Sequence, residues 1–332
     1  MRPFRTRWPA ALAVMLTAAS FAACGGDSDD VVPTSAASPK VLSVQGGLDR
    51  PVSLSVADLK ALPPTTQTVS YGSGAGPQTH TYTGTNLWNL LDQAGIQVDA
   101  ARKNDVLGKY VLATGADGYQ AVFSLAELKP DFGNRPSLVV YEEAASGVSS
   151  ALGTDGPVRV TAPGDVKGGR YVSALTRLDV RDAGSTATGT GGGVTTSFTV
   201  SGAVKSPGTY DLAALQALPA VTRTVGANVY RGVSLWDFLN TTTGLVLDPA
   251  VKNDVLGKYV VATGSDGYRA LIALGEIEPG FGNAPNLIAY EVDGAPLTTS
   301  GFARLVVPGD TKAGRFVSNL VGIEVLAARP AP

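Results

Sequence analysis

An internal repeat constrains the fold of this chain more than any other feature of its sequence. Residues 103–119 match residues 252–268 at 15 of 17 positions, and residues 163–173 match residues 308–318 at 8 of 11. Matches that recur in the same order at nearly constant spacing predict two copies of one folding unit. We place copy 1 at residues 40–181 and copy 2 at residues 197–328.

The pattern within each copy predicts a fold of mixed type. The chain has 40 glycines and 21 prolines, which favour many turns and short strands. In copy 1, Ser55 is expected to cap a short helix that runs to Ala61, and Thr85 to cap a helix that Gly95 ends. Asp117-Gly118 is typical of a hairpin turn. Strands are expected at residues 66–71, 79–83, 109–114, 119–124, 137–141, 158–162 and 177–180. The predicted class is α+β, with two homologous strand-dominated domains and short helices.

The first residues have the pattern of an export signal. Three arginines precede an apolar run from Ala10 to Phe21, which is too short to span a bilayer comfortably. The sequence Phe21-Ala22-Ala23-Cys24 resembles the lipobox of bacterial lipoproteins, in which the cysteine is lipidated. We predict a signal peptide at residues 1–23 and lipidation of Cys24, the only cysteine. The alternative is a plain secretory signal.

This signal leads to a prediction of location. Gly25, rather than aspartate, follows the cysteine, which by resemblance to lipoprotein sorting signals favours the outer membrane. We expect an exported protein held by its lipid anchor in the cell envelope, at the outer membrane and facing the periplasm. Residues 24–39 are small, polar and acidic, as in a flexible tether, and the Gly/Thr-rich residues 182–196 are expected to be an interdomain linker.

Charge and residue types exclude several functions. The 26 basic and 28 acidic residues are nearly balanced and form no basic cluster, so nucleic acid is not an expected partner. His80 is the only histidine, and a lone histidine is more often hydrogen-bonded than a metal ligand. We predict no metal site. Neither a nucleophile elbow nor a catalytic triad is evident, so we assign no catalytic residue.

The ordered motifs of both copies carry a family resemblance. Copy 1 has a tryptophan-containing helix, then TGADGY, AEL, LVVYEE and PVRVTAPGDVKGGRYVSALTRLDV, and copy 2 repeats this order with SLWDFL, TGSDGY, LIAYEVDGAPL and ARLVVPGDTKAGRFVSNLVGIEV. This set resembles the molybdopterin-binding domain of sulfite-oxidase-type oxidoreductases, present twice in tandem. The resemblance implies a molybdopterin cofactor whose molybdenum is bound by one cysteine thiolate.

Both copies depart from the family at the position of that cysteine. The resemblance places it upstream of the tryptophan helix, in residues 68–74 (TVSYGSG) and 224–228 (TVGAN), and neither segment contains cysteine. A soft thiolate ligand cannot be exchanged for another residue without changing the metal's electronic properties and geometry. Ser70 or Ser73 could supply an oxygen ligand in copy 1. Copy 2 has no hydroxyl group between Thr224 and Tyr230.

The candidate binding residues lie in two repeated motifs. Backbone N–H groups of a glycine-rich turn can hold an anion, and neighbouring lysine and arginine can add charge-assisted bonds. The resemblance also implies a cofactor pocket near the aspartate-glycine-tyrosine turns. The alternative for the glycine-rich loops is a tight turn between strands with solvated cations, and the alternative for the aspartate-glycine-tyrosine motifs is a hairpin turn with a core tyrosine. The candidates are Gly164, Lys167, Gly168, Arg170, Gly309, Lys312, Arg315, Tyr119, Tyr268 and Arg269.

Two hypotheses of function follow. The first is a non-catalytic binding or interaction protein whose partner is a small anionic ligand or another envelope protein. The second is a periplasmic molybdopterin-dependent oxidoreductase that uses a ligand other than cysteine. The missing cysteine favours the first. A purely structural envelope module is a third possibility.

Overall fold

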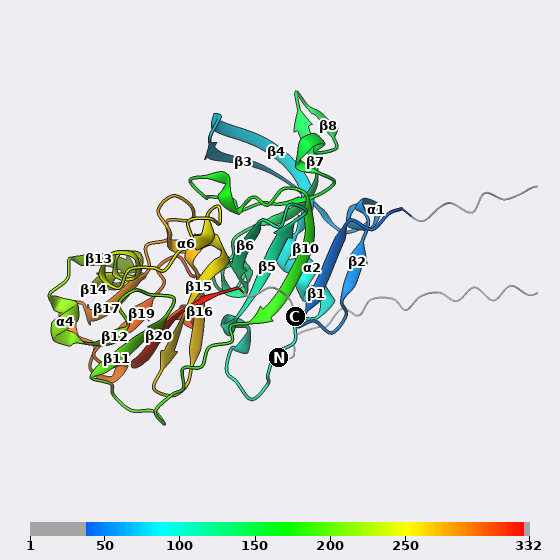
Figure 1. The fold of residues 1–332 in the computed structure, drawn as a ribbon. Helices are drawn as coiled ribbons and strands as arrows, with labels where there is room; N and C mark the ends of the chain where they lie inside the picture. Colours follow the sequence, from blue (N-terminus) through cyan, green and yellow to red (C-terminus); the bar gives the residue numbers. More distant parts are fainter. Residues whose placement is uncertain (1–37, 329–332) are drawn as a thin grey trace, which may run out of the picture. The chain divides into compact units, whose positions relative to one another are not determined.

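The computed structural model describes residues 38–328, and copy 1 contributes two sheets with short helices between their strands (Figure 1). Its elements are β1 (Leu42–Gly46), β2 (Val52–Leu54), α1 (Val56–Lys60), β3 (Pro64–Ser73), β4 (Gly76–Asn86), α2 (Leu87–Ala94), β5 (Lys109–Gly115), β6 (Gln120–Ser124), α3 (Leu125–Leu128), β7 (Leu138–Ala145), β8 (Val148–Ser150), β9 (Arg159–Val160) and β10 (Leu175–Asp182). One sheet has the order β2-β1-β10-β5-β6, and the other has the order β3-β4-β7-β8 with β9 paired to β7.

Copy 2 repeats this arrangement. Its elements are β11 (Ser197–Gly202), β12 (Gly208–Asp211), α4 (Leu212–Gln216), β13 (Ala220–Val225), β14 (Asn228–Ser234), α5 (Leu235–Asp237), β15 (Lys258–Gly264), β16 (Arg269–Ala273), α6 (Leu274–Ile277), β17 (Leu287–Val292), β18 (Ala295–Pro296), β19 (Arg304–Val306) and β20 (Leu320–Ala327). The sheet orders are β12-β11-β20-β15-β16 and β13-β14-β17-β18, with β19 paired to β17. The structure therefore confirms the predicted α+β class with two similar strand-rich arrangements.

Local sequence explains most element ends. Ser55 caps α1 as predicted, because its side chain accepts a hydrogen bond from the Asp58 backbone while Asp58 bonds back to Ser55. Gly95 ends α2 with a positive φ of 79°. The cap of α2 is Asn86 and not Thr85, one residue later than predicted. The strand predicted at residues 158–162 is shorter, at Arg159–Val160.

Strands β5, β6, β15 and β16 join the two copies. Tyr110, Leu112 and Val122 of copy 1 form one buried cluster with Tyr259 and Val261 of copy 2. The rings of Tyr110 and Tyr259 lie 4.7 Å apart. All residues of β5 and β15 are buried, since each strand has its own core on one face and the other copy on the opposite face. Residues from Ser38 onward accordingly form one compact unit.

The predicted signal peptide, Cys24 and most of the predicted tether lie outside the described residues. Within residues 38–328, no helix is both long and apolar enough to cross a membrane.

Candidate functional site

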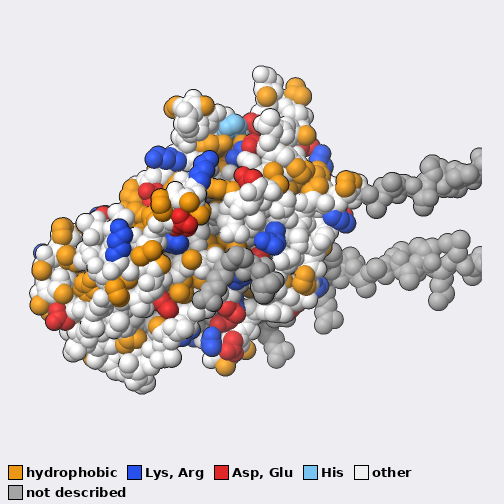
Figure 2. All heavy atoms as spheres, viewed as in Figure 1, with side chains coloured by type: hydrophobic (Ala, Val, Ile, Leu, Met, Phe, Trp, Pro, Cys, Tyr) orange, Lys and Arg blue, Asp and Glu red, His pale blue; other side chains and the backbone are white. Residues whose placement is uncertain are grey.

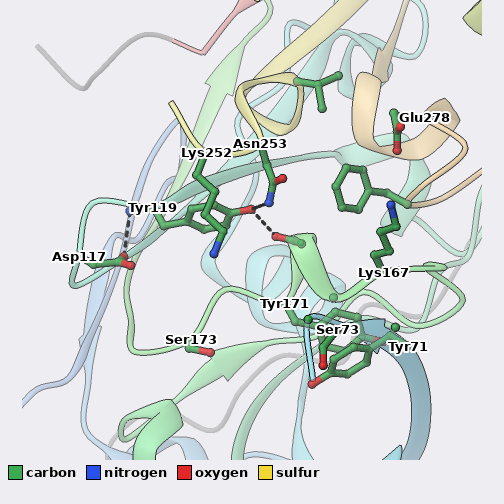
Figure 3. A pocket seen from close by; sticks show the side chains of 16 residues that line it. Tyr71, Ser73, Asp117, Tyr119, Lys167, Tyr171, Ser173, Lys252, Asn253 and Glu278 are labelled. Atoms are coloured by element: carbon green, nitrogen blue, oxygen red, sulfur yellow. Dashed lines mark hydrogen bonds between the residues drawn. The ribbon is translucent and has the colours of Figure 1, made fainter. Parts of the chain in front are cut away.

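A pocket of about 860 Å³ lies where loops of the two copies meet (Figure 3). Copy 1 supplies the end of β3, the hairpin turn before β6 and the glycine-rich loop that contains Lys167 and Gly168. Copy 2 supplies Lys252, Asn253 and Phe281. The pocket is therefore composite, and neither copy has all of its walls.

Tyr119 joins the two sides of the pocket. Its hydroxyl accepts a hydrogen bond from Asn253 Nδ2 at 2.8 Å and donates one to the carbonyl oxygen of Gly169, also at 2.8 Å (Figure 3). Burial raises the pKa of the Tyr119 phenol, so the group stays neutral and can donate. Asn253 has a positive φ of 54°, a conformation that asparagine tolerates better than most residues. Tyr119, a predicted site residue, thus lies at the pocket and fixes its shape.

The cations of the pocket are two exposed lysines. Lys167 comes from the glycine-rich loop of copy 1 and Lys252 from copy 2, and neither forms an ion pair with a residue in the described part of the chain. Two carboxylates, Asp117 and Glu278, also line the pocket. Asp117 accepts a hydrogen bond from the Tyr119 backbone at 2.9 Å, as part of its own turn. The pocket thus holds two lysines without an ion-pair partner in the described part of the chain, beside two carboxylates. On the face of the molecule drawn in Figure 2, basic and acidic side chains are likewise interspersed.

Two tyrosine rings form one wall of the pocket. The rings of Tyr71 and Tyr171 lie 4.3 Å apart and are tilted by 35° to each other (Figure 3). His80, which does not line the pocket, stacks on Tyr71 at 5.6 Å. The Tyr171 hydroxyl is buried without a hydrogen-bond partner among residues 38–328. His80 contacts Glu143 at 2.6 Å, in agreement with the hydrogen-bonded role predicted for a lone histidine.

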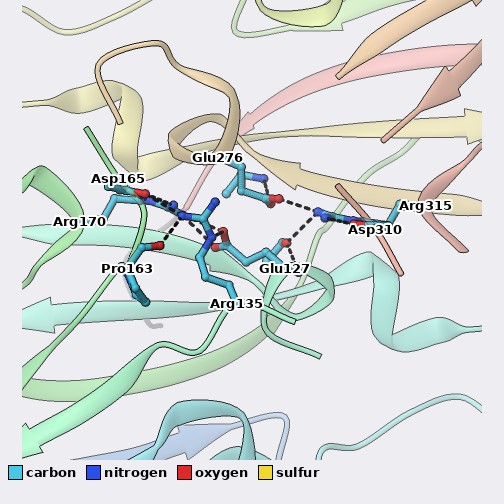
Figure 4. A network of polar contacts seen from close by, with 10 residues as sticks. Glu127, Arg135, Pro163, Asp165, Arg170, Glu276, Asp310 and Arg315 are labelled. Atoms are coloured by element: carbon cyan, nitrogen blue, oxygen red, sulfur yellow. Dashed lines mark hydrogen bonds and ion pairs between the residues drawn. The ribbon is translucent and has the colours of Figure 1, made fainter. Parts of the chain in front are cut away.

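The structure gives Arg170 a different surrounding from the one predicted. Its guanidinium group is 0% exposed and forms bonds of 2.7–2.8 Å to Asp165 and 2.9–3.0 Å to Glu127 (Figure 4). The donors that we expected to face an anion are therefore already used by carboxylates inside the protein. In the glycine-rich loop, Lys167 reaches the pocket and Arg170 holds the interior together.

The loop of copy 2 has the same internal arrangement. Arg315 is 3% exposed and pairs with Asp310 at 2.5 Å and Glu276 at 2.6 Å (Figure 4). Lys312, the counterpart of Lys167, is exposed and pairs with Asp131 of copy 1 at 2.5 Å. The second loop thus contributes to packing between the copies and does not offer a free cation.

The other predicted residues lie in exposed turns or form hydrogen bonds in copy 2. Gly164 and Gly309 are exposed and do not line the pocket. The Tyr268 hydroxyl donates to Gly314 at 2.5 Å, which mirrors the bond of Tyr119 to Gly169. Arg269 donates to the carbonyl of Ala187 in the predicted linker. The structure therefore brings together Tyr119, Lys167 and Gly168 of the predicted set.

Sequence reasoning missed the other walls of the pocket. Lys252 and Asn253 begin the longest repeated segment, and that repetition was the one available signal. Phe281 gave no signal, because its place at the pocket depends on how the two copies pack. Tyr71 and Tyr171 lie in segments that the sequence singled out, at residues 68–74 and 163–173, but nothing there indicated that their rings would meet.

The carboxyl group of Glu127 gives a testable pH dependence. Burial, together with the nearby Glu276 carboxylate, raises the pKa of Glu127 to about 7, above the ordinary value of 4.5. The folded chain therefore binds more protons than the unfolded chain between these two values, and stability must fall as the pH rises through this range. We expect a loss on the order of 3 kcal/mol of unfolding free energy from this group.

Urea unfolding at several pH values between about 4 and 8 measures this loss. The Glu127→Gln variant should lack the decline that Glu127 causes. Glu291→Gln, which removes a partly exposed carboxylate paired with Arg231 at 3.2 Å, serves as the control and should keep this decline. Equal pH slopes in wild type and Glu127→Gln would contradict the assignment.

Comparison with known proteins relates the first half of the chain to one family. Residues 31–188 match the family model described as "Oxidoreductase molybdopterin binding domain". Among solved structures, the sulfane dehydrogenase SoxCD from Paracoccus pantotrophus is similar at 14% sequence identity and a TM-score of 0.35, over 84% of this chain and 77% of that chain. No curated protein matches. The family match supports the resemblance for copy 1, and copy 2 is related to it through the repeat.

The pocket can be tested for its fit to the cofactor of that family. The segment in which the resemblance implies a cysteine ends in the pocket, where it contributes Tyr71 to Gly74 and no sulfur. Ser70 bonds to Thr79 on an exposed surface, which leaves Ser73 as the serine of this segment that lines the pocket. No cluster of three or more histidine, cysteine or acidic residues able to hold a metal exists in residues 38–328. The residues present do not fit a thiolate-bound molybdenum centre.

Proposed function

We propose that this chain is an envelope lipoprotein that binds a small anionic ligand in the composite pocket and is not a molybdenum enzyme. The observation that carries the proposal is the combination of Lys167 and Lys252, both without an ion-pair partner in the described part of the chain, with a family cysteine segment that lacks sulfur. The lysines keep an anion-binding capacity, whereas the donor that would hold the metal is missing.

The aromatic wall adds specificity to this proposal. The Tyr71 and Tyr171 rings offer an apolar surface beside the lysines. Ser73 and Ser173 add hydroxyl oxygens, whose protons are donated to Gly76 and Asp155. Pockets of this kind, mostly apolar with a few polar groups, orient small ligands. The predicted lipid anchor at Cys24 would hold the pocket at the outer membrane, facing the periplasm.

Native mass spectrometry tests the proposal. We expect wild-type protein purified from its envelope to release a small anion, and the Lys167→Ala/Lys252→Ala double variant to retain at least about tenfold less, because both charge-assisted contacts are removed. Lys205→Ala, at an exposed lysine outside the pocket, is the matched control and should behave as wild type. Retention of the same anion by the double variant would contradict the proposal.

A molybdopterin-dependent oxidoreductase with an oxygen ligand is the second candidate. It is favoured by Ser73, which lies in the segment of the missing cysteine and lines the pocket. The released mass separates the two candidates, since a molybdopterin would identify the second.

A further inference from the structure

Copy 2 contains a smaller counterpart of the composite pocket. Its volume is about 330 Å³, against about 860 Å³ for the first pocket. Several residues at its walls occupy the repeat positions of residues in the first pocket, with the contributions of the two copies exchanged. Lys312, the counterpart of Lys167, is not among them because it pairs with Asp131, so Lys103 is the lysine of this pocket. Lys103, Asn104, Asp266 and Tyr268 stand where the first pocket has Lys252, Asn253, Asp117 and Tyr119.

The linker between the copies lies against this second pocket. Gly192 and Gly193 are among its lining residues. The backbone N–H groups of Thr190 and Gly192 donate to the carbonyl of Ser265 at 2.8 and 2.9 Å. The Ser265 hydroxyl, in turn, donates to the carbonyl of Gly193 at 2.7 Å. The linker is therefore bound to copy 2. Among residues 38–328, no segment preceding copy 1 lines the first pocket in this way.

The backbone conformation of the linker requires glycine at several positions. Gly191, Gly192 and Gly193 have φ values of 87°, 93° and 90°, which other residues rarely adopt. A Cβ atom on Gly189 would overlap the backbone of the Ser265–Gly267 turn. Glycine thus allows the linker to approach the pocket closely. The glycine content of the linker therefore follows from its contact with copy 2.

The residues that hold the linker are positions at which the copies differ. The repeated segments 103–120 and 252–269 differ at three positions. At one of them, Ser265 replaces Ala116 and gains the hydroxyl that bonds to Gly193. At another, Arg269 replaces Gln120 and gains the guanidinium group that donates to Ala187. Copy 2 therefore has contacts to the linker that copy 1 lacks the side chains to make.

We propose that linker residues 189–193 act as a built-in occupant that closes a second anion site in copy 2. Within residues 38–328, the composite pocket lined by Lys167 and Lys252 is then the site that stays open. That the closed pocket would take the same class of ligand rests on the proposed function. That the linker closes it rests on the contacts above.

Hydrogen exchange tests the closure. Gly189→Ala places a methyl group against the backbone of copy 2 and should free the linker. We expect the amides of Thr190 and Gly192 to exchange at least about tenfold faster in this variant. Thr188→Ala, at an exposed neighbouring residue, should leave both rates unchanged. The Ser265→Ala/Arg269→Gln variant, which restores the copy 1 residues, should accelerate them without adding bulk. Unprotected amides in the wild type would overturn the closure.

An NMR titration with inorganic phosphate tests the ligand class. In the wild type we expect amide shifts around Tyr119 and Gly169 alone, and in Gly189→Ala additional shifts around Tyr268 and Gly314. Shifts at both pockets of the wild type would overturn the closure. Gly189→Ala could lose the slow amide exchange and still show phosphate shifts at the first pocket only. That result would show that the second pocket is not an anion site. Shifts at neither pocket would contradict the proposed function and leave the closure to be decided by exchange.

Discussion

Replacing Arg170 by methionine is expected to lower the free energy of unfolding by about 3–5 kcal/mol, because it removes the fully buried counter-ion of two buried carboxylates. Arg135, which lies 2.9 Å from Asp165 and 3.7 Å from Glu127, is then the cation that remains beside them in the described part of the chain. Arg170 is fully buried and bonds to both Glu127 and Asp165 (Figure 4). Methionine fills much of the same volume but cannot neutralise either group. Urea unfolding at pH 8 measures the loss, since Glu127, whose pKa is about 7, is then ionised.

Arg231→Met is the matched control for this prediction. Arg231 pairs with Glu291 at 3.2 Å, but half of its side chain is exposed, and exposed pairs of this kind contribute about 0–1 kcal/mol. If Arg170→Met and Arg231→Met lowered stability equally, Arg170 could not be the counter-ion of a buried network. Arg315→Met should resemble Arg170→Met, since it removes the matching group from copy 2.

Adding a methyl group at Gly169 or Gly314 is expected to lower stability by about 1–3 kcal/mol, because the contact between the copies is already closely packed. A Cβ atom on Gly169 would overlap the Phe281 ring of copy 2, and one on Gly314 would overlap the Phe132 ring of copy 1. Thermal or urea unfolding of Gly169→Ala and Gly314→Ala measures the effect. Gly108→Ala is the control, since no atom lies within 4 Å of its Cβ position.

A double-mutant cycle assigns the loss to the named ring. Phe281→Leu alone should destabilise, but in the Gly169→Ala background it should restore part of the loss, because the smaller side chain makes room for the methyl group. Additive losses would show that the strain at Gly169 arises elsewhere.

The repeat and the local signals were sufficient for the fold class. Ser55 and Gly95 set helix ends through backbone bonds to nearby residues, so their effect is visible in the sequence. The contacts between the copies were not visible, because they depend on residues far apart in the chain. Leu112 and Val261 are typical of a buried strand, and the sequence pattern is the same whether the outer face of that strand packs against another domain or against a helix.

The same limit explains what was missed in the candidate site. A basic residue in a glycine-rich loop can face a ligand or a buried acid, and Arg170 has its second acid at Glu127, 43 residues away. Asp165, five residues before Arg170 in the loop, was the available hint. Lys252 and Phe281 could be placed at the pocket of copy 1 only by the packing of copy 2 against it.

The molybdenum content of the full chain tests the central claim most directly. Protein should be produced in a molybdenum-replete host that makes molybdopterin, purified without chelators, and measured by elemental analysis together with pterin fluorescence after oxidation. Because the pocket segment from Tyr71 to Gly74 offers no sulfur, we predict far less than one molybdenum per chain and no pterin fluorescence. One molybdenum and one pterin per chain would contradict the account.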